Sequence, residues 1–128
     1  MGTLADISLV ALGGLLGAVG RFLFSRWASR TLGAGFPSGT LLINFLGSLL
    51  IGFFLVWTTE RVLADPRWRL LVAIGFCGAF TTYSSYAFET LKLYEEGAAR
   101  LALINVAANN LAALTAVVLG AVIARKIA

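Results

Sequence analysis

Residues 75–90 read GFCGAFTTYSSYAFET and fall within the third apolar stretch of the chain. The middle of this segment alternates aromatic rings with hydroxyl side chains: Phe80, Thr81, Thr82, Tyr83, Ser84, Ser85 and Tyr86. Lipid offers no hydrogen-bond partner to hydroxyls or to freed backbone groups. A membrane therefore tolerates such a run only where it packs against protein or lines a wet cavity. The segment predicts a membrane helix that is interrupted and polar near its middle.

The composition of the chain indicates that lipid is its solvent. Of 128 residues, 59% are hydrophobic and only 12% are charged, well below the roughly 25% charged residues of an average soluble domain. The net charge is +4, but the basic residues form no cluster away from the helix ends, which argues against nucleic acid as a partner. A single cysteine, Cys77, and no histidine exclude disulfides, zinc sites and imidazole chemistry.

Four uncharged stretches are each close to the length that a helix needs to cross a bilayer, which is about 20 residues. We therefore expect an all-α membrane protein with one four-helix transmembrane domain over residues 1–128. The spans are predicted near residues 4–24, 40–59, 70–88 and 101–124. Gly13 and Gly17 in the first span have the small-xxx-small spacing that lets helix backbones approach closely.

Polar residues recur at helical spacing in the second and fourth spans. Thr40, Asn44 and Ser48 fall on one stripe of the second span. There they either form hydrogen bonds to neighbouring helices or line a polar pathway. The fourth span contains three asparagines, of which the first two share a face: Asn105, Asn109 and Asn110. Such residues are costly in a membrane unless they are paired or wet.

The positive charges give the chain no preferred orientation in the membrane. With four spans, one side carries five of the ten basic residues and the other side also carries five: Arg61, Arg67, Arg69, Arg125 and Lys126 against Arg21, Arg26, Arg30, Lys92 and Arg100. Orientation normally follows an excess of Lys and Arg on one side. The balance indicates either an antiparallel dimer of two oppositely inserted copies or a partner chain of opposite bias.

The pattern of reactive residues predicts no enzyme, because no pair of intramembrane carboxylates and no phosphate-binding loop in a suitable context is present. A helix break over residues 78–81 would instead free carbonyls for a cation and N–H groups for an anion. Tyr83 and Tyr86 just beyond it either pack between helices or present electropositive ring edges to an anion.

Three motifs resemble the Fluc family of small fluoride channels. The opening segment is similar to that family's third-helix signature, G-x-T-T-F-S-T-F. GTLLINFLGS at residues 39–48 resembles its second-helix motif, and GAVGRF at residues 17–22 resembles its first-helix element with glycine and arginine. The chain length, the four spans and the balanced charge match the family over nearly the whole chain.

This resemblance implies a dual-topology antiparallel dimer with two fluoride pathways and a structural sodium ion at the centre of its interface. The sodium ligands would be the backbone carbonyls of Gly78 and Thr81 from each chain. Together with the polar stripes, the predicted ion pathway comprises Arg21, Thr40, Asn44, Tyr83, Ser84, Ser85, Tyr86, Glu89 and Asn109. Arg21 matches the vestibule arginine of the family, and Glu89 matches the acidic residue that follows the aromatic pair.

The chain departs from the family pattern at two places. Tyr83 and Tyr86 stand where the family has phenylalanines, so hydroxyl hydrogen bonding can replace coordination by ring edges. Ala113 and Val117 follow Asn109 where Ser or Thr is expected. Either departure fits a homodimer with altered properties or one half of a heterodimer.

The main hypothesis is a passive, fluoride-selective channel in the inner (plasma) membrane that lets cytoplasmic fluoride leave the cell. Its partners would be fluoride, lipid and a second chain. One alternative is a proton-coupled transporter resembling the small multidrug resistance family. Such a transporter needs a membrane-embedded carboxylate, and no span carries one near its middle. A further alternative is a non-transporting membrane assembly or chaperone subunit.

Overall fold

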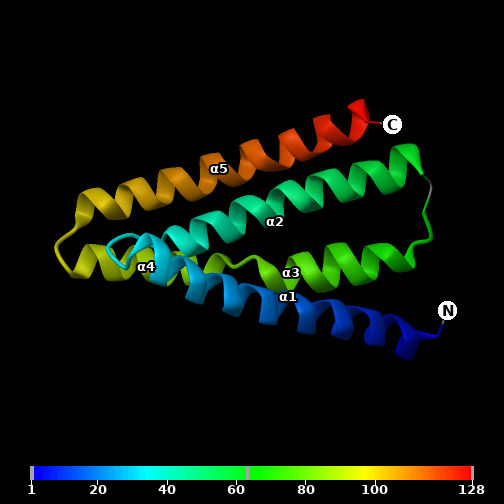
Figure 1. The fold of residues 1–128 in the computed structure, drawn as a ribbon, viewed down its shortest axis with the longest axis horizontal. Helices are drawn as coiled ribbons and strands as arrows, with labels where there is room; N and C mark the ends of the chain where they lie inside the picture. The colour runs from blue at the N-terminus through cyan, green and yellow to red at the C-terminus, as the bar shows by residue number, and fades with distance from the viewer. Residues whose placement is uncertain (1, 63, 128) are drawn as a thin grey trace.

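The computed structural model describes residues 2–62 and 64–127, and these residues form four long antiparallel helices (Figure 1). The first is α1 (Thr3–Leu32), and the second is α2 (Ser38–Val56) with its π-helical continuation η1 (Trp57–Arg61). The third span consists of η2 (Arg69–Cys77, π-helical), α3 (Gly78–Phe80) and α4 (Tyr83–Glu95). The fourth is α5 (Ala99–Lys126).

All four spans are long and apolar enough to cross a membrane, which confirms the prediction of four spans. The helices are longer than the predicted apolar spans because helical structure continues into the charged residues at the span ends. The two described termini lie at the same end of the bundle (Figure 1), as an even number of spans requires.

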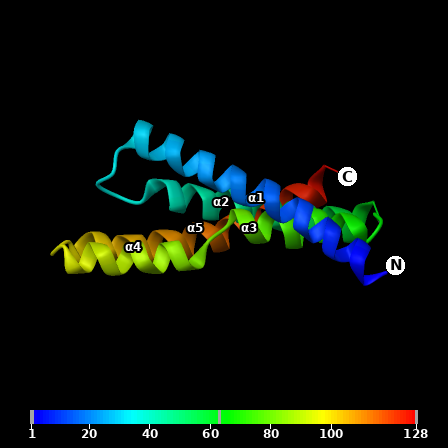
Figure 2. The ribbon, with the colours of Figure 1, turned by 90° about the horizontal axis from the view of Figure 1, so that it is seen from below.

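The third span changes neighbours along its length. Its first half, η2 and α3, packs against α1, whereas its second half, α4, packs against α5; α2 and α5 contact each other extensively. Seen from below, α1 crosses near α3 and then diverges from α4 (Figure 2). The third span therefore has α1 as its main neighbour before the break and α5 as its main neighbour after it.

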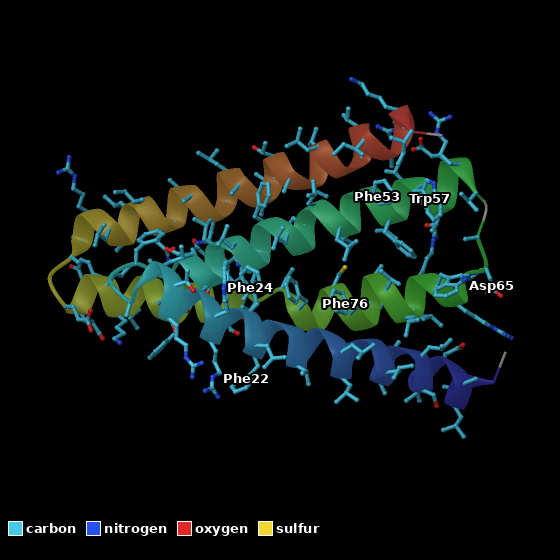
Figure 3. All side chains as sticks on the ribbon, viewed as in Figure 1. Phe22, Phe24, Phe53, Trp57, Asp65 and Phe76 are labelled. Carbon is cyan, nitrogen blue, oxygen red and sulfur yellow. The ribbon has the colours of Figure 1, made fainter. Side chains whose placement is uncertain are left out.

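The first span packs against η2 through glycine. A Cβ atom added to Gly13 would lie 2.0 Å from the Leu71 carbonyl oxygen, and one added to Gly17 would lie 2.3 Å from the Phe76 carbonyl oxygen. The small-xxx-small prediction is confirmed: the two backbones approach closely because neither glycine carries a side chain. Phe76, labelled in Figure 3, belongs to the η2 side of this contact.

Large apolar side chains cover much of the outer surface, while small and polar residues fill the interior. α1 alone exposes a set of such side chains: Leu12, Leu15, Leu16, Val19, Phe22 and Leu23. Phe53 and Trp57 stack along the second span with ring centroids 6.1 Å apart (Figure 3). This distribution inverts that of a soluble bundle and fits a protein whose surface faces lipid or a second chain.

The helix break in the third span is confirmed, although it begins later than expected. Gly78 keeps helical dihedrals (φ −61°, ψ −36°). Thr81 and Thr82 are extended, with φ/ψ of −77°/157° and −151°/115°. A residue pair without a glycine carries the break, so side-chain hydrogen bonds rather than glycine flexibility must stabilise it.

Candidate functional site

Asn44 on α2 holds the extended peptide at the break. Its Oδ1 accepts the Thr82 N–H at 2.9 Å, and its Nδ2 donates to the Thr82 carbonyl oxygen at 3.1 Å. A primary amide thus pairs with both backbone groups of one residue, as a neighbouring strand would. In a continuous helix the Thr82 N–H would donate to the Gly78 carbonyl, so this pairing deprives Gly78 of its usual donor.

Thr82 then caps the helix that follows. Its Oγ1 accepts the Ser85 N–H at 3.1 Å and donates to Ser85 Oγ at 3.0 Å, which is the usual geometry of a threonine N-cap. In a continuous helix the Ser85 N–H would donate to the Thr81 carbonyl oxygen. The carbonyls of Gly78 and Thr81, the two predicted cation ligands, therefore both lose their regular helical donors.

A chain of amides links the break to α5 and back to α4. Asn44 Nδ2 donates to Asn109 Oδ1 at 3.1 Å, and Asn109 Nδ2 donates to Asn105 Oδ1 at 2.9 Å. Asn105 Nδ2 donates to Thr90 Oγ1 at 2.9 Å, and Thr90 Oγ1 donates to the Tyr86 carbonyl at 2.8 Å. We call these four residues, Asn44, Asn109, Asn105 and Thr90, the amide relay. Asn105 is fully buried, and its amide is satisfied within the relay.

A cavity of about 370 Å³ adjoins the break. It is lined by residues of α2, the third span and α5: Asn44, Gly47, Ser48, Ile51, Cys77, Gly78, Thr81, Thr82, Tyr83, Tyr86, Asn109, Asn110, Ala113 and Leu114. None of these lining residues is charged. The lining offers amides, hydroxyls and aromatic rings, which can bind a dehydrated ion through dipoles.

The two tyrosines meet edge to face within this cavity. Their ring centroids are 5.1 Å apart at an interplanar angle of 71°. Tyr86 is buried, whereas Tyr83 is 75% exposed. Ser84 and Ser85 do not line the cavity; their hydroxyls lie 3.4 and 3.0 Å from Thr82 Oγ1.

A second cavity, of about 560 Å³, lies between the end of α1, the α1–α2 connection and α4. Thr40 Oγ1 donates to Glu89 Oε1 here at 2.8 Å. The other carboxylate oxygen of Glu89 is buried, without a hydrogen-bond partner in the described residues. Arg26 lines this cavity and Arg21 does not. Sequence reasoning counted Arg26 only as part of the charge balance, because nothing local distinguishes the two arginines.

The polar stripe of α2 was expected either to hydrogen-bond to neighbouring helices or to line a polar pathway. Thr40 and Asn44 both bond to other helices, which confirms the first interpretation. Ser48 lies on the same stripe and lines the first cavity. On α5, Asn109 and Ala113 line it as well.

Sequence reasoning missed Thr90, although it belongs to the opening segment, because its partner comes from another helix.

Four apolar spans, the third of them broken, with a polar cavity of uncharged lining at the break, define a small multi-pass membrane protein with a polar interior. Residues 8–121 match the family described as "CrcB-like protein, Camphor Resistance (CrcB)". The chain belongs to this family.

Curated relatives match along most of the chain. A protein from Koribacter versatilis (strain Ellin345) is 52% identical over 118 residues, covering 92% of this chain and 94% of the relative. One from Legionella pneumophila (strain Paris) is 43% identical, covering 92% and 88%. One from Sulfurihydrogenibium sp. (strain YO3AOP1) is 39% identical, covering 93% and 96%. Each is named a fluoride-specific ion channel FluC, so the family resemblance inferred from the motifs is confirmed.

Proposed function

We propose that this chain is a fluoride-specific ion channel that lets cytoplasmic fluoride leave the cell passively through the inner (plasma) membrane. The observation that carries the proposal is the charge-free cavity of amides, hydroxyls and ring edges at the helix break, in a chain whose relatives carry that name. HF that enters a cell dissociates and leaves fluoride trapped, so a passive pathway is enough to relieve the accumulation.

The two cavities supply different stages of such a pathway. The larger one carries charged residues of both signs, including Arg26, Lys92 and Glu89, and serves as a vestibule in which the ion is still hydrated. The smaller one carries no charge on its lining and serves as the narrow part, where donors replace the water shell. Asn44 has both Nδ2 hydrogens engaged, so its role is to hold the break open.

We further propose that residues 1–128 form one transmembrane domain and that two copies assemble as an antiparallel dimer. The equal division of Lys and Arg supports both orientations. Tyr83, beside the break, is largely exposed in the single chain, which leaves its ring free to contact a second copy. A heterodimer with a second, non-identical chain is the competing arrangement.

The carbonyls of Gly78 and Thr81 fit a sodium ion at the centre of this dimer. Both have lost their regular helical donors to side-chain competition, and oxygen ligands of this kind suit a hard cation. The ion would supply a fixed positive charge that holds the two breaks together. We expect Gly78→Leu to cover the carbonyls and abolish any sodium dependence of flux; a mutant with unchanged sodium dependence would count against this site.

The channel proposal is tested with liposomes that contain only the purified chain, with fluoride and chloride release followed by ion-selective electrodes. Rapid fluoride release with negligible chloride release is expected. No fluoride release from monodisperse, helical protein would overturn the homomeric channel, and restored release on adding a second family chain would establish the heterodimer.

A further inference from the structure

The side-chain amide of Asn110 has a fixed orientation. Its Nδ2 lies 2.8 Å from the carbonyl oxygen of Val106 and 3.3 Å from the hydroxyl oxygen of Tyr86. A carbonyl can only accept, so the amide atom that faces Val106 must be the nitrogen. That nitrogen has two hydrogens, one for each contact. The Tyr86 oxygen therefore accepts a hydrogen bond from Asn110.

Because of this contact, the hydroxyl proton of Tyr86 points away from Asn110. A phenol has one donor and can also accept; here the accepting side faces Asn110, so the O–H is directed elsewhere. Tyr86 is buried, at 6% exposure, and the hydroxyl donates to no acceptor in the part of the chain that the structure describes. Buried donors normally have a partner. Tyr86 and Asn110 line the same charge-free cavity, which is where an acceptor has room.

We propose, resting on the channel function above, that the Tyr86 hydroxyl donates a hydrogen bond to the anion in this cavity and that Asn110 is a positioning residue for that proton. The bound species is a small halide with strong accepting power. Fluoride accepts hydrogen bonds far more strongly than chloride, so one correctly directed O–H favours fluoride.

The third tyrosine of the chain provides a matched control. Tyr94 lies on α4 as Tyr86 does, is 66% exposed, and lines a separate surface depression near Leu103 and Val106. Tyr94→Phe deletes the same atom from the same helix away from the cavity, so it reports any general effect of losing a phenol.

Flux through liposomes containing the full chain distinguishes the roles. We expect Tyr86→Phe to lower the fluoride rate by roughly tenfold, the effect of one hydrogen bond to an ion. We expect Asn110→Leu to lower it by about twofold to threefold, because the freed phenol can rotate away from the anion. The double variant should match Tyr86→Phe, since Asn110 acts only through the hydroxyl. Tyr94→Phe should match wild type.

A second measurement observes the hydroxyl directly. In detergent-solubilised protein with ¹³C at the tyrosine Cζ position, fluoride should shift the Tyr86 resonance, identified by its loss in Tyr86→Phe, and chloride should not. Asn110→Leu should weaken the shift. Wild-type fluoride flux in Tyr86→Phe, or a Tyr86 resonance that ignores fluoride, would overturn this inference and leave water as the partner of the hydroxyl. Absent fluoride flux in the wild type would instead overturn the channel proposal.

Discussion

The two halves of the third span contact the bundle by different means. The η2 half meets α1 through bare backbone, with Gly13 and Gly17 against the carbonyls of Leu71 and Phe76. The α4 half meets α2 and α5 through side-chain hydrogen bonds, two of them donated by asparagine amides of α5. The first kind of contact is steric and tolerates no added atom. The second is polar and depends on the direction of each donor. The break at Thr81 and Thr82 lies where one kind gives way to the other.

This difference shows how a membrane protein combines a rigid frame with a polar interior. Close backbone packing stabilises helices in lipid without any polar group, so the η2 half can anchor the bundle. The α4 half then carries buried polar groups, most of which hydrogen-bond to neighbouring helices. Neither half alone would hold an extended peptide at membrane depth.

The largest effect is expected at the steric contact. Gly13→Ala places a methyl group 2.0 Å from the Leu71 carbonyl oxygen, so α1 and η2 must separate at a cost of about 3 kcal/mol or more. Gly14→Ala is the matched control, because nothing lies within 4 Å of its added Cβ. Thermal unfolding of both variants in detergent measures the difference; equal midpoints would refute the steric account of this half.

The next effect is expected at Asn44, where the polar half begins. Asn44→Ala leaves the Thr82 N–H and the Asn109 Oδ1 without partners, at a cost of about 1–3 kcal/mol for each group that stays buried. The break should lose its fixed geometry, and fluoride flux through liposomes should fall severely while the protein still assembles. Ser48→Ala, on the same stripe without a comparable bond, should leave the unfolding midpoint unchanged. Wild-type flux in Asn44→Ala would show that conduction does not require Asn44 to hold the break.

The features that the sequence predicted correctly are those that depend on the residues of one segment alone. Four apolar stretches of sufficient length predict four spans, and the glycines that precede the threonine pair predict a break in the third, because each signal lies within one segment. The spacing of Gly13 and Gly17 predicted close packing for the same reason. Which helix they pack against does not follow from the spacing.

The features that sequence reasoning missed depend on how the helices are rotated about their axes. The pairing of Asn105 with Thr90, and of Asn110 with Tyr86, requires faces of α4 and α5 to be matched, and no local pattern encodes this. The break was expected from residue 78 because glycine weakens a helix. It occurs at Thr81 because Asn44, from a different span, competes for the Thr82 N–H.

A smaller effect is expected at the far end of the amide relay. Thr90→Val keeps the shape but removes the acceptor for Asn105 Nδ2 and the donor to the Tyr86 carbonyl. We expect a loss of about 1–2 kcal/mol from the unsatisfied buried amide, seen as a lower unfolding midpoint. Thr90→Ser retains the hydroxyl and should recover most of that loss. Equal midpoints for the two variants would show that the relay ends at Asn105.

The smallest effect is expected for the polar contact near the end of the bundle that holds the termini, where Arg125 of α5 pairs with Glu60 of η1. The guanidinium donates from Nη2 to Oε1 at 2.8 Å and from Nε to Oε2 at 3.0 Å, yet both side chains are about half exposed, at 52% and 46%. Exposed pairs gain little over hydrated charges and weaken further in salt. Arg125→Gln should therefore leave the unfolding midpoint and the fluoride flux close to wild type, even at low salt. A large loss would mean that polar side chains also stabilise this end of the bundle, and the contrast between the two halves would no longer stand.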